Sequence, residues 1–370
     1  MFDSCACRNG YTGKSAMKIL SQIMNAGINE ARITGASELN PHGSDIALSD
    51  SYGRAINYVR LSVTDLCNFK CDYCLPDGYK KTPSRIEPLG LDEYEVLLKV
   101  LADLGVQKIR VTGGEPVLRK DLTRILQCVQ RNNIAQLHLS TNGYQLARNL
   151  PIWQHCGVKG INISIDRFDE SAFAKITGHS LLPQIISAID ESLRRYAFTL
   201  KVNMVLMSQF ALVQLEEALD FVRDRNIDLR FIELMQTQNN VSVFASDHVK
   251  ANDLIKKIES DGWTAAGRTH ATAGPANMYE HRDFAGRIGF IKPYSPGFCD
   301  SCNRIRISSN GEIHSCLFAT KNSDIRSFMH PHLHEKLKES IQKAIAYKPA
   351  AHALSEGQPG LMRELAQLGG

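Results

Sequence analysis

The chain has 370 residues, with 43 Lys and Arg against 39 Asp and Glu and a formal net charge of +4. This length favours one large or two ordinary domains, and 43% hydrophobic with 22% charged residues excludes wholesale disorder. No apolar run is long enough for a membrane span, and the charge is too small to indicate nucleic-acid binding by itself. We expect a globular protein that binds neither a membrane nor nucleic acid.

Ten cysteines are few for this length, but six of them fall in two tight groups. A secreted disulfide framework would be denser and would lie in a shorter chain. Clustered cysteines in a chain of this composition indicate metal or redox chemistry. The two groups are Cys67, Cys71 and Cys74, and Cys299, Cys302 and Cys316; the other cysteines are Cys5, Cys7, Cys128 and Cys156.

Residues 1–50 differ from the rest of the chain, with scattered Gly, Ser and Asn and one helix-like stretch at 16–25. They lack the long apolar core of a secretory signal. Arg8, Lys14 and Lys18 precede the second acidic residue of the chain, so an organellar transit peptide is an alternative. We expect a flexible extension on a cytoplasmic protein, because clustered cysteines that serve metal or redox chemistry need a reducing compartment.

From residue 57 on, apolar runs of strand length alternate with helix-like stretches. The predicted strands are 58–63, 108–111, 136–139, 160–165, 199–205 and 228–234. The predicted helices are 91–104, 121–130, 182–195 and 212–225. Strands that alternate with helices form right-handed βα units around a parallel sheet. The choice is then between an open doubly wound sheet and a partial (β/α) barrel.

The interiors of the predicted strands decide between these two folds. Polar residues alternate with apolar ones along the strands, as Arg60 and Ser62 do with Val59 and Leu61. Alternate side chains of a strand point to opposite faces, so one face packs under helices and the other lines a polar space. A polar, solvent-accessible interior favours an α/β fold of the partial, TIM-like (β/α)6 barrel type.

Five cations lie on or near this polar wall, and buried charges need partners. Internal salt bridges to Asp166 or Glu233, or snorkelling at a strand end, would explain any one of them. Five together favour an anionic ligand, and a polyphosphate is the obvious type. The five are Arg60, Lys108, Arg110, Lys201 and Arg230.

The chain after the sixth strand is less regular. The predicted elements are a helix at 251–258, strands at 287–292, 305–308 and 312–316, and a helical tail at 324–370 with a loop around 348–360. Asn310-Gly311 predicts a hairpin turn. We expect three parts, which are an extension at 1–50, the barrel at 51–235, and a C-terminal α+β region at 236–370 that covers the barrel opening.

The first cysteine group reads C-x3-C-x2-C and follows directly after the first predicted strand. Loops at the carboxyl ends of barrel strands carry the functional sites of such folds. Three thiolates can hold an iron–sulfur cluster with one iron left open, which is what a reaction centre needs. A thioredoxin-like pair, Cys71 and Cys74, and a zinc site with a distant fourth ligand are the alternatives.

This motif resembles that of the radical S-adenosylmethionine (SAM) superfamily, in which an aromatic residue, here Tyr73, precedes the last cysteine. The G-G-E-P run after the second strand is similar to the superfamily's motif for the methionine amino group of SAM. Glycines let backbone groups approach a ligand, and Glu115 offers a carboxylate to an ammonium. The resemblance implies SAM contacts at Tyr73, Gly113, Gly114, Glu115, Asn142, Ser164 and Met235.

The second cysteine group reads C-x2-C-x13-C and again has three cysteines. His314 stands two residues before Cys316, so a Cys3His zinc site is an alternative from spacing alone. Arg304 and Arg306 stand two apart, so both can point the same way, towards an anion or a purine edge. A solvated strand face is the other interpretation of this pair.

Taken together, the motifs resemble the GTP 3′,8-cyclase family of molybdenum cofactor biosynthesis from about Gly53 to Gly370. Besides the cysteine motifs, the matching segments are K-I-R-V-T-G-G-E-P, R-F-I-E-L-M, G-P-A, the R-I-R after the second C-x2-C, and the terminal double glycine. The chain departs from the family at residues 1–50, which have no counterpart, and at 236–247, which lack a Pro-Gly type continuation.

The resemblance implies a radical SAM lyase with two [4Fe–4S] clusters, the first holding SAM and the second holding guanine. An adenosyl radical takes the C3′ hydrogen of GTP, and the ribose radical attacks C8. An electron donor and cyclic pyranopterin monophosphate synthase, the next enzyme, are implied partners, and a homodimer is compatible. Gly369 and Gly370 would thread into the active site. The implied GTP contacts are Arg60, Lys108, Ser140, Lys201, Arg230, Arg304 and Arg306.

Two other functions stay open at this point. One is another two-cluster radical SAM enzyme, such as a peptide-modifying maturase, although those usually carry more C-terminal cysteines and lack the R-x-R after C-x2-C. The other is a zinc-binding scaffold without catalysis, built on the second cysteine group.

Overall fold

The computed structural model describes residues 48–80, 86–267 and 274–368. The expectations for 1–47, among them the helix at 16–25, lie outside these described residues, as do those for Gly369 and Gly370. The described chain begins in packed structure, because Leu48 is buried and Ser49 forms a bridge with Ala55. No helix in the described ranges is both long and apolar enough to cross a membrane.

All six predicted strands of the barrel form, and they pair side by side in chain order. Each pairs in parallel with the next, as right-handed βα units require. This arrangement confirms the partial barrel. The strands are β1 (Tyr58–Ser62), β2 (Lys108–Thr112), β3 (Gln136–Thr141), β4 (Gly160–Ser164), β5 (Thr199–Leu206) and β6 (Asp228–Glu233).

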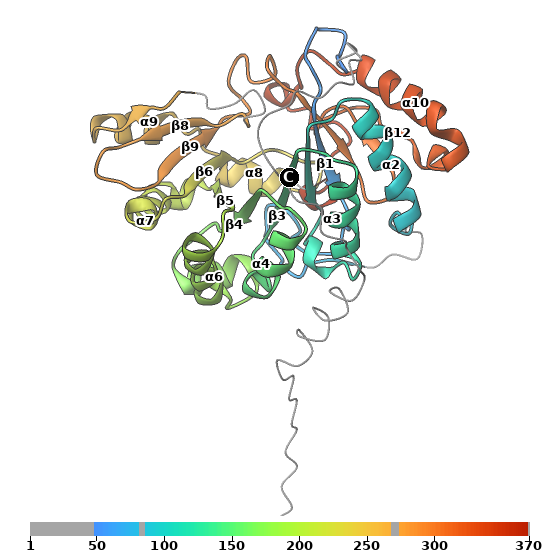
Figure 1. Ribbon diagram of the computed structural model, residues 1–370. Coiled ribbons are helices and arrows are strands. Elements are labelled where there is room, and N and C mark those ends of the chain that lie inside the picture. Colours follow the sequence, from blue (N-terminus) through green and yellow to red (C-terminus); the bar gives the residue numbers. More distant parts are fainter. Residues whose placement is uncertain (1–47, 81–85, 268–273, 369–370) are drawn as a thin grey trace, which may run out of the picture. The chain divides into compact units, whose positions relative to one another are not determined.

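Helices cover the outer face of this curved sheet (Figure 1). Their apolar sides, for example Leu97, Ile125 and Ile189, are completely or almost completely buried against the strands. The four predicted helices are present as α2 (Leu91–Asp103), α3 (Leu122–Arg131), α6 (Leu182–Arg195) and α7 (Ala211–Arg223). Three further helices were not predicted: α4 (Leu146–His155), α5 (Glu170–Thr177) and α8 (Val241–Asp247).

The C-terminal region extends the sheet at both edges. β10 (Arg304–Ile307) pairs in parallel with β1, and β9 (Arg287–Ile291) pairs in parallel with β6. Eight neighbouring strands of the described sheet therefore run parallel to one another, two more than the six predicted. The hairpin at Asn310-Gly311 is confirmed, since β10 turns there into antiparallel β11. The remaining elements are α9 (Asn252–Ser260), β7 (Thr264–Ala265), β8 (Asn277–Glu280), β11 (Glu312–His314) and β12 (Ser323–Asp324).

The tail is less helical than predicted. α10 (His334–Ala346) is the one α-helix described after residue 324, and the chain from 348 to 368 forms turns and two short 3₁₀ segments. Pro349, Pro359 and Gly360 interrupt any helical pattern there. This stretch instead builds a second, small apolar cluster, whose buried members are Leu317, Phe318, Leu354, Met362, Leu365 and Leu368.

Candidate active site

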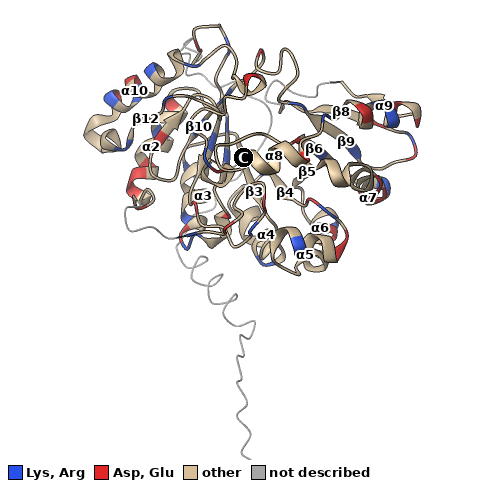
Figure 2. Cartoon of the chain, turned by 180° about the vertical axis from the view of Figure 1, so that it is seen from behind, with Lys and Arg blue, Asp and Glu red and all other residues tan. Residues whose placement is uncertain are grey.

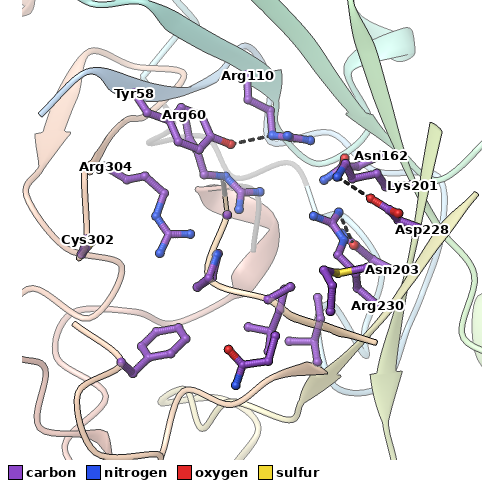
Figure 3. Close-up of a pocket in the computed structure, with 18 of the residues that line it drawn as sticks. Tyr58, Arg60, Arg110, Asn162, Lys201, Asn203, Asp228, Arg230, Cys302 and Arg304 are labelled. Atoms are coloured by element: carbon purple, nitrogen blue, oxygen red, sulfur yellow. Dashed lines mark hydrogen bonds and ion pairs between the residues drawn. The ribbon is translucent and has the colours of Figure 1, made fainter. Parts of the chain in front are cut away.

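A cavity of about 870 Å³ lies against the polar face of the sheet. Alternate residues of the strands line it, as the period of two predicted, and their side chains point into one space (Figure 3). All five cations singled out from the strands line it, and so do both arginines of β10. The outer helices, by contrast, carry charges of both signs (Figure 2).

The strand register sets the arginines of this wall side by side. Arg60 on β1 has Arg306 of β10 as its Cα partner on one side and Arg110 of β2 on the other. Burial lowers the pKa of Arg60 well below its usual range, and the neighbouring Arg306 lowers it further. Like charges in such a row repel one another, so the wall is suited to an anion that carries several charges.

A second row of the same wall contains a tyrosine between two cations. Tyr58 has Arg304 and Lys108 as its Cα partners, and its hydroxyl accepts a 2.6 Å hydrogen bond from Arg110 Nε. Burial alone would raise the pKa of Tyr58, but Arg110, Arg60 and Lys108 outweigh it and lower this pKa to about 7. The phenol therefore carries partial negative charge near neutral pH.

Lys201 and Arg230 stand on the opposite side of the cavity with polar partners. Lys201 Nζ lies 2.6 Å from Asp228 Oδ2, and the same carboxylate pairs with Arg287 at 2.7 Å. Arg230 Nη2 donates a 2.6 Å hydrogen bond to Asn203 Oδ1. Nε of Arg230 has no hydrogen-bond partner among the described residues, so this side still offers donors to a ligand.

The acids predicted as internal partners for the cations have other roles. Asp166 accepts from the Tyr73 hydroxyl at 2.8 Å and from the Val205 amide. Glu233 accepts from the Ala251 amide at 2.9 Å. The salt-bridge alternative was therefore wrong for these two carboxylates, although Asp228 supplies one acid that the sequence had not singled out.

A neutral histidine completes the floor of the cavity. Burial lowers the pKa of His138 to about 2, with Arg110 and Lys108 acting in the same direction. The ring fits because residue 160 on the adjacent strand is glycine; a Cβ there would lie 2.5 Å from His138 Nδ1. His138 thus offers a hydrogen bond to a ligand without adding charge.

The first cysteine group lies in the loop after β1. Amides of Cys74 and Leu75 both donate to the Cys71 carbonyl, at 2.9 and 2.8 Å, so the thiols sit on one tight turn. Burial raises the pKa of Cys67 to about 11 and that of Cys74 to about 12. For Cys74, the neighbouring Cys67 acts in the same direction. The three thiols therefore lie close enough to one another to interact electrostatically.

The G-G-E-P loop packs directly against this turn. A Cβ on Gly113 would lie 2.3 Å from the Thr64 carbonyl oxygen, and one on Gly114 would lie 2.2 Å from that of Leu66. The amides of Gly114 and Glu115 donate to those same two carbonyls, at 2.8 and 2.6 Å. The glycines are thus required for contact between two loops, and the approach of a ligand to them stays a prediction.

Glu115 is completely buried, and its carboxylate joins its own loop to the loop after β3. Its carboxylate accepts from Thr141 Oγ1 at 2.9 Å, from the Asn142 amide at 2.6 Å and from the Val117 amide at 3.1 Å. Burial raises its pKa to about 7. The side chain predicted to meet an ammonium is therefore engaged with this chain's own backbone.

The other residues assigned to SAM surround the same loop. Asn142 Nδ2 lies 3.9 Å from Cys67 Sγ, and the Tyr73 carbonyl accepts from Asn240 Nδ2 at 3.1 Å. Ser164 is exposed at the carboxyl end of β4. Met235 both lines the cavity and packs with Tyr73 on the small apolar cluster.

The second cysteine group borders the cavity, with Cys299 and Cys302 before β10 and Cys316 after β11. Burial would raise the pKa of Cys302, but Arg304 and Lys348 outweigh it and lower this pKa to about 7. The two cations therefore favour the thiolate form of Cys302, which is the form that binds a metal.

Two cations that the sequence did not indicate fix this second group. Arg54 Nη1 donates to the Cys299 carbonyl at 3.0 Å, and its Nε pairs with Asp50 at 2.6 Å. Lys348 donates to the carbonyls of Arg304 and Ser315. Both cations bind backbone oxygens of distant segments, and such partners leave no signal in residue spacing.

The zinc alternative does not match this geometry. His314 Nε2 lies 3.6 Å from Glu312, its neighbour on the same strand. Within the ranges that the structure covers, no group of three or more His, Cys, Asp or Glu is close enough to hold one metal ion. In an iron–sulfur cluster each cysteine binds a different iron, so its ligands need not meet at one metal ion.

The tail connects the two cysteine groups. Arg306 Nη1 donates to the Leu368 carbonyl at 3.4 Å, next to the terminal glycines, and the Ala366 backbone hydrogen-bonds to Cys74. Cys74 and Cys316 both pack on the small apolar cluster that the tail builds. The described part of the tail therefore lies in the space between the two groups.

Comparison with known proteins agrees with this arrangement. Residues 61–222 match the Radical SAM superfamily, and residues 227–354 match the Molybdenum Cofactor Synthesis C family. A GTP 3′,8-cyclase of Actinobacillus pleuropneumoniae is 39% identical over 325 residues, covering 87% of this chain and 95% of the relative. One of Synechococcus elongatus is 40% identical over 327 residues, covering 88% and 100%. The chain belongs to the GTP 3′,8-cyclase family.

Solved structures support the fold of this GTP 3′,8-cyclase family member. Streptococcus suis SuiB bound to S-adenosylmethionine superposes with a TM-score of 0.54 at 13% identity, covering 84% of this chain and 77% of that protein. This likeness shows a shared fold. Membership of the radical SAM superfamily means that the chain uses SAM and an iron–sulfur cluster.

Proposed function

We propose that this chain converts GTP into 3′,8-cyclo-7,8-dihydro-GTP, the first step of molybdenum cofactor biosynthesis. The observation that carries the proposal is the cavity wall, where Arg306, Arg60 and Arg110 stand in register beside the second cysteine group. A nucleoside triphosphate has both the charges for such a wall and a base for the cysteine end. The family relatives carry this activity in their names.

Two [4Fe–4S] clusters fit the two cysteine groups. Cys67, Cys71 and Cys74 would hold the first cluster, which would supply the one-electron chemistry for the cleavage of bound SAM. The residues proposed to surround SAM are Tyr73, Gly113, Gly114, Glu115, Asn142, Ser164 and Met235. The glycine loop and Glu115 also hold the cysteine turn in place. Cys299, Cys302 and Cys316 hold the second cluster, which faces the nucleotide.

The remaining residues fix the substrate. Arg60, Arg304 and Arg306 anchor GTP on one side of the cavity, and Lys201 and Arg230 anchor it on the other. A primary carbon radical attacks almost any nearby C–H bond, so the ribose C3′ must be held against its source. Lys108 adds a further charge on the wall, and Ser140 lies on β3 with its hydroxyl buried and unpaired within the described part.

The tail keeps water out of this space. Its leucines and Met362 pack on Phe318 between the two cysteine groups, which closes the path to the radical. An external electron donor must reduce the enzyme for each turnover. The product goes to cyclic pyranopterin monophosphate synthase, the next enzyme of this route.

Anaerobic incubation of the reconstituted enzyme with SAM, dithionite and GTP tests the proposal. We expect 5′-deoxyadenosine that depends on GTP, together with a cyclised nucleotide in equal amount. SAM cleavage at the same rate with and without GTP would contradict GTP as the substrate. It would favour another two-cluster enzyme of the radical SAM superfamily. A colourless protein with tightly held zinc and no sulfide would contradict the enzyme altogether.

GTP affinity is expected to fall as the pH rises from 7 to 9. Burial lowers the pKa of Lys108 to about 8, with Arg110 acting in the same direction. The free enzyme therefore loses the charge of Lys108 above pH 8. Bound phosphate keeps Lys108 protonated, so the Kd for GTP rises about tenfold between pH 7 and pH 9. Deprotonation of Tyr58 acts in the same direction. Equilibrium dialysis with radiolabelled GTP measures the effect.

The matched variants for this prediction are Lys108→Met and Lys99→Met. Lys99 is exposed on α2 and does not line the cavity. We expect Lys108→Met to bind GTP more weakly at pH 7 and to show a shallower rise of the Kd with pH. An unchanged slope in Lys108→Met would show that another group titrates.

A further inference from the structure

Lys348 follows α10 and is almost entirely buried, with 3% of its surface exposed. Its ammonium donates to the Arg304 carbonyl at 3.0 Å and also to the Ser315 carbonyl. Arg304 comes two residues after Cys302, and Ser315 directly precedes Cys316. One side chain therefore ties together the two segments that carry the second cysteine group.

Within the part of the chain that the structure describes, this lysine has no carboxylate partner. No Asp or Glu among the described residues forms an ion pair with Lys348, whereas Lys201 on the same cavity has Asp228. A buried cation without an opposite charge is costly. The groups that can balance it are the thiolates of the two segments that it binds, since Cys302 precedes Arg304 by two residues and Cys316 directly follows Ser315.

We propose that Lys348 is a positioning residue for the second iron–sulfur cluster: it holds the two ligand segments at their spacing and raises the reduction potential of that cluster. The inference rests on the proposed function, which places a [4Fe–4S] cluster on Cys299, Cys302 and Cys316. Reduction adds one negative charge to the cluster, and a fixed cation beside it stabilises the reduced form.

A role in helix termination is the competing explanation. Lys348 follows the last turn of α10, and its amide donates to the Ile345 carbonyl at 2.9 Å. That bond comes from the backbone and survives any side-chain replacement. Variants that separate charge from hydrogen bonding therefore distinguish the two roles. Lys348→Gln retains a donor for the carbonyls and loses the charge, whereas Lys348→Arg retains both.

The experiment is an EPR-monitored redox titration of the anaerobically reconstituted full-length enzyme, with iron and sulfide analysis. The second cluster is identified as the signal that changes when GTP is added. Lys343→Gln, an exposed lysine of the same helix α10, is the matched control. The measurement is a midpoint potential, so it does not depend on turnover.

We expect Lys348→Gln to shift the second cluster's equilibrium towards the oxidised form by about tenfold, which is about 59 mV for one electron. Lys348→Arg and Lys343→Gln should stay close to the wild type. Loss of about four iron atoms in Lys348→Gln, but not in Lys348→Arg, supports the positioning role equally.

A wild-type potential and full iron content in Lys348→Gln would overturn the inference. So would an equal shift in Lys343→Gln, or loss of the second cluster in Lys348→Arg as well. These failures differ from failure of the proposed function. In that case the wild-type enzyme itself would bind only about four iron atoms or show no signal that responds to GTP.

Discussion

Gly114→Ala is expected to cleave SAM about 100-fold more slowly than the wild type, although it removes no ligand and changes no charge. The added Cβ would lie 2.2 Å from the Leu66 carbonyl oxygen and 2.7 Å from that of Asp65. Both are backbone atoms, so no side chain can rotate away. The cysteine turn must move by about 1 Å, and a displacement of this size near a reacting centre costs about two orders of magnitude in rate.

The measurement is single-turnover formation of 5′-deoxyadenosine, corrected for iron content. Thermal unfolding should show a loss of about 3 kcal/mol, typical of severe overpacking. Gly90→Ala is the control, because a Cβ there meets only the Glu93 carboxylate at 3.6 Å; it weakens the start of α2 by about 1 kcal/mol at most. SAM cleavage at the wild-type rate in Gly114→Ala would contradict the tight packing of the two loops.

The barrel was predictable because its signals are local. Each strand shows a period of two within its own residues, so Arg60, Lys108 and Lys201 could be assigned to one face without knowing the fold. That face does line one cavity. The alternation of polar and apolar residues identified the cations of this face. The parallel order of the strands placed these cations next to one another.

The edges of the sheet were not predictable in the same way. β10 pairs with β1 although Arg304 lies far along the chain from Tyr58, and no local pattern encodes such a pairing. β9 and β10 are short and follow irregular segments, so they indicated a separate α+β region. α4 was hidden because it contains Pro151 and begins after Gln145, a non-glycine residue with a φ of 54°.

The site shows the same division between side-chain and backbone information. Cysteine spacing and the G-G-E-P run identified two loops, and the structure brings them into contact. The structure adds a second reason for the glycines, because they pack against the backbone of Thr64 and Leu66. Arg54 and Lys348 escaped notice since their partners are carbonyl oxygens, which every residue carries.

Arg306→Ala is the second variant with a large expected effect, a loss of about 100-fold in cyclised product with SAM affinity close to the wild type. Arg306 stands next to Arg60 in the cavity wall and donates to the Leu368 carbonyl of the tail. Its removal takes a charge from the nucleotide and an anchor from the tail. None of the hydrogen bonds described for Arg306 goes to the cysteine turn or to the glycine loop, so SAM should bind as in the wild type.

The measurement separates the effect on SAM binding from the effect on the nucleotide. SAM affinity by equilibrium binding and product formation by chromatography are compared in the same preparation. Arg282→Ala, an exposed arginine away from the cavity, is the control and should match the wild type in both. Because a loosely held nucleotide no longer presents C3′ alone, Arg306→Ala should also release 5′-deoxyadenosine in excess over cyclised product. Wild-type product formation, or an equal loss of SAM affinity, would contradict a role for Arg306 in holding the nucleotide.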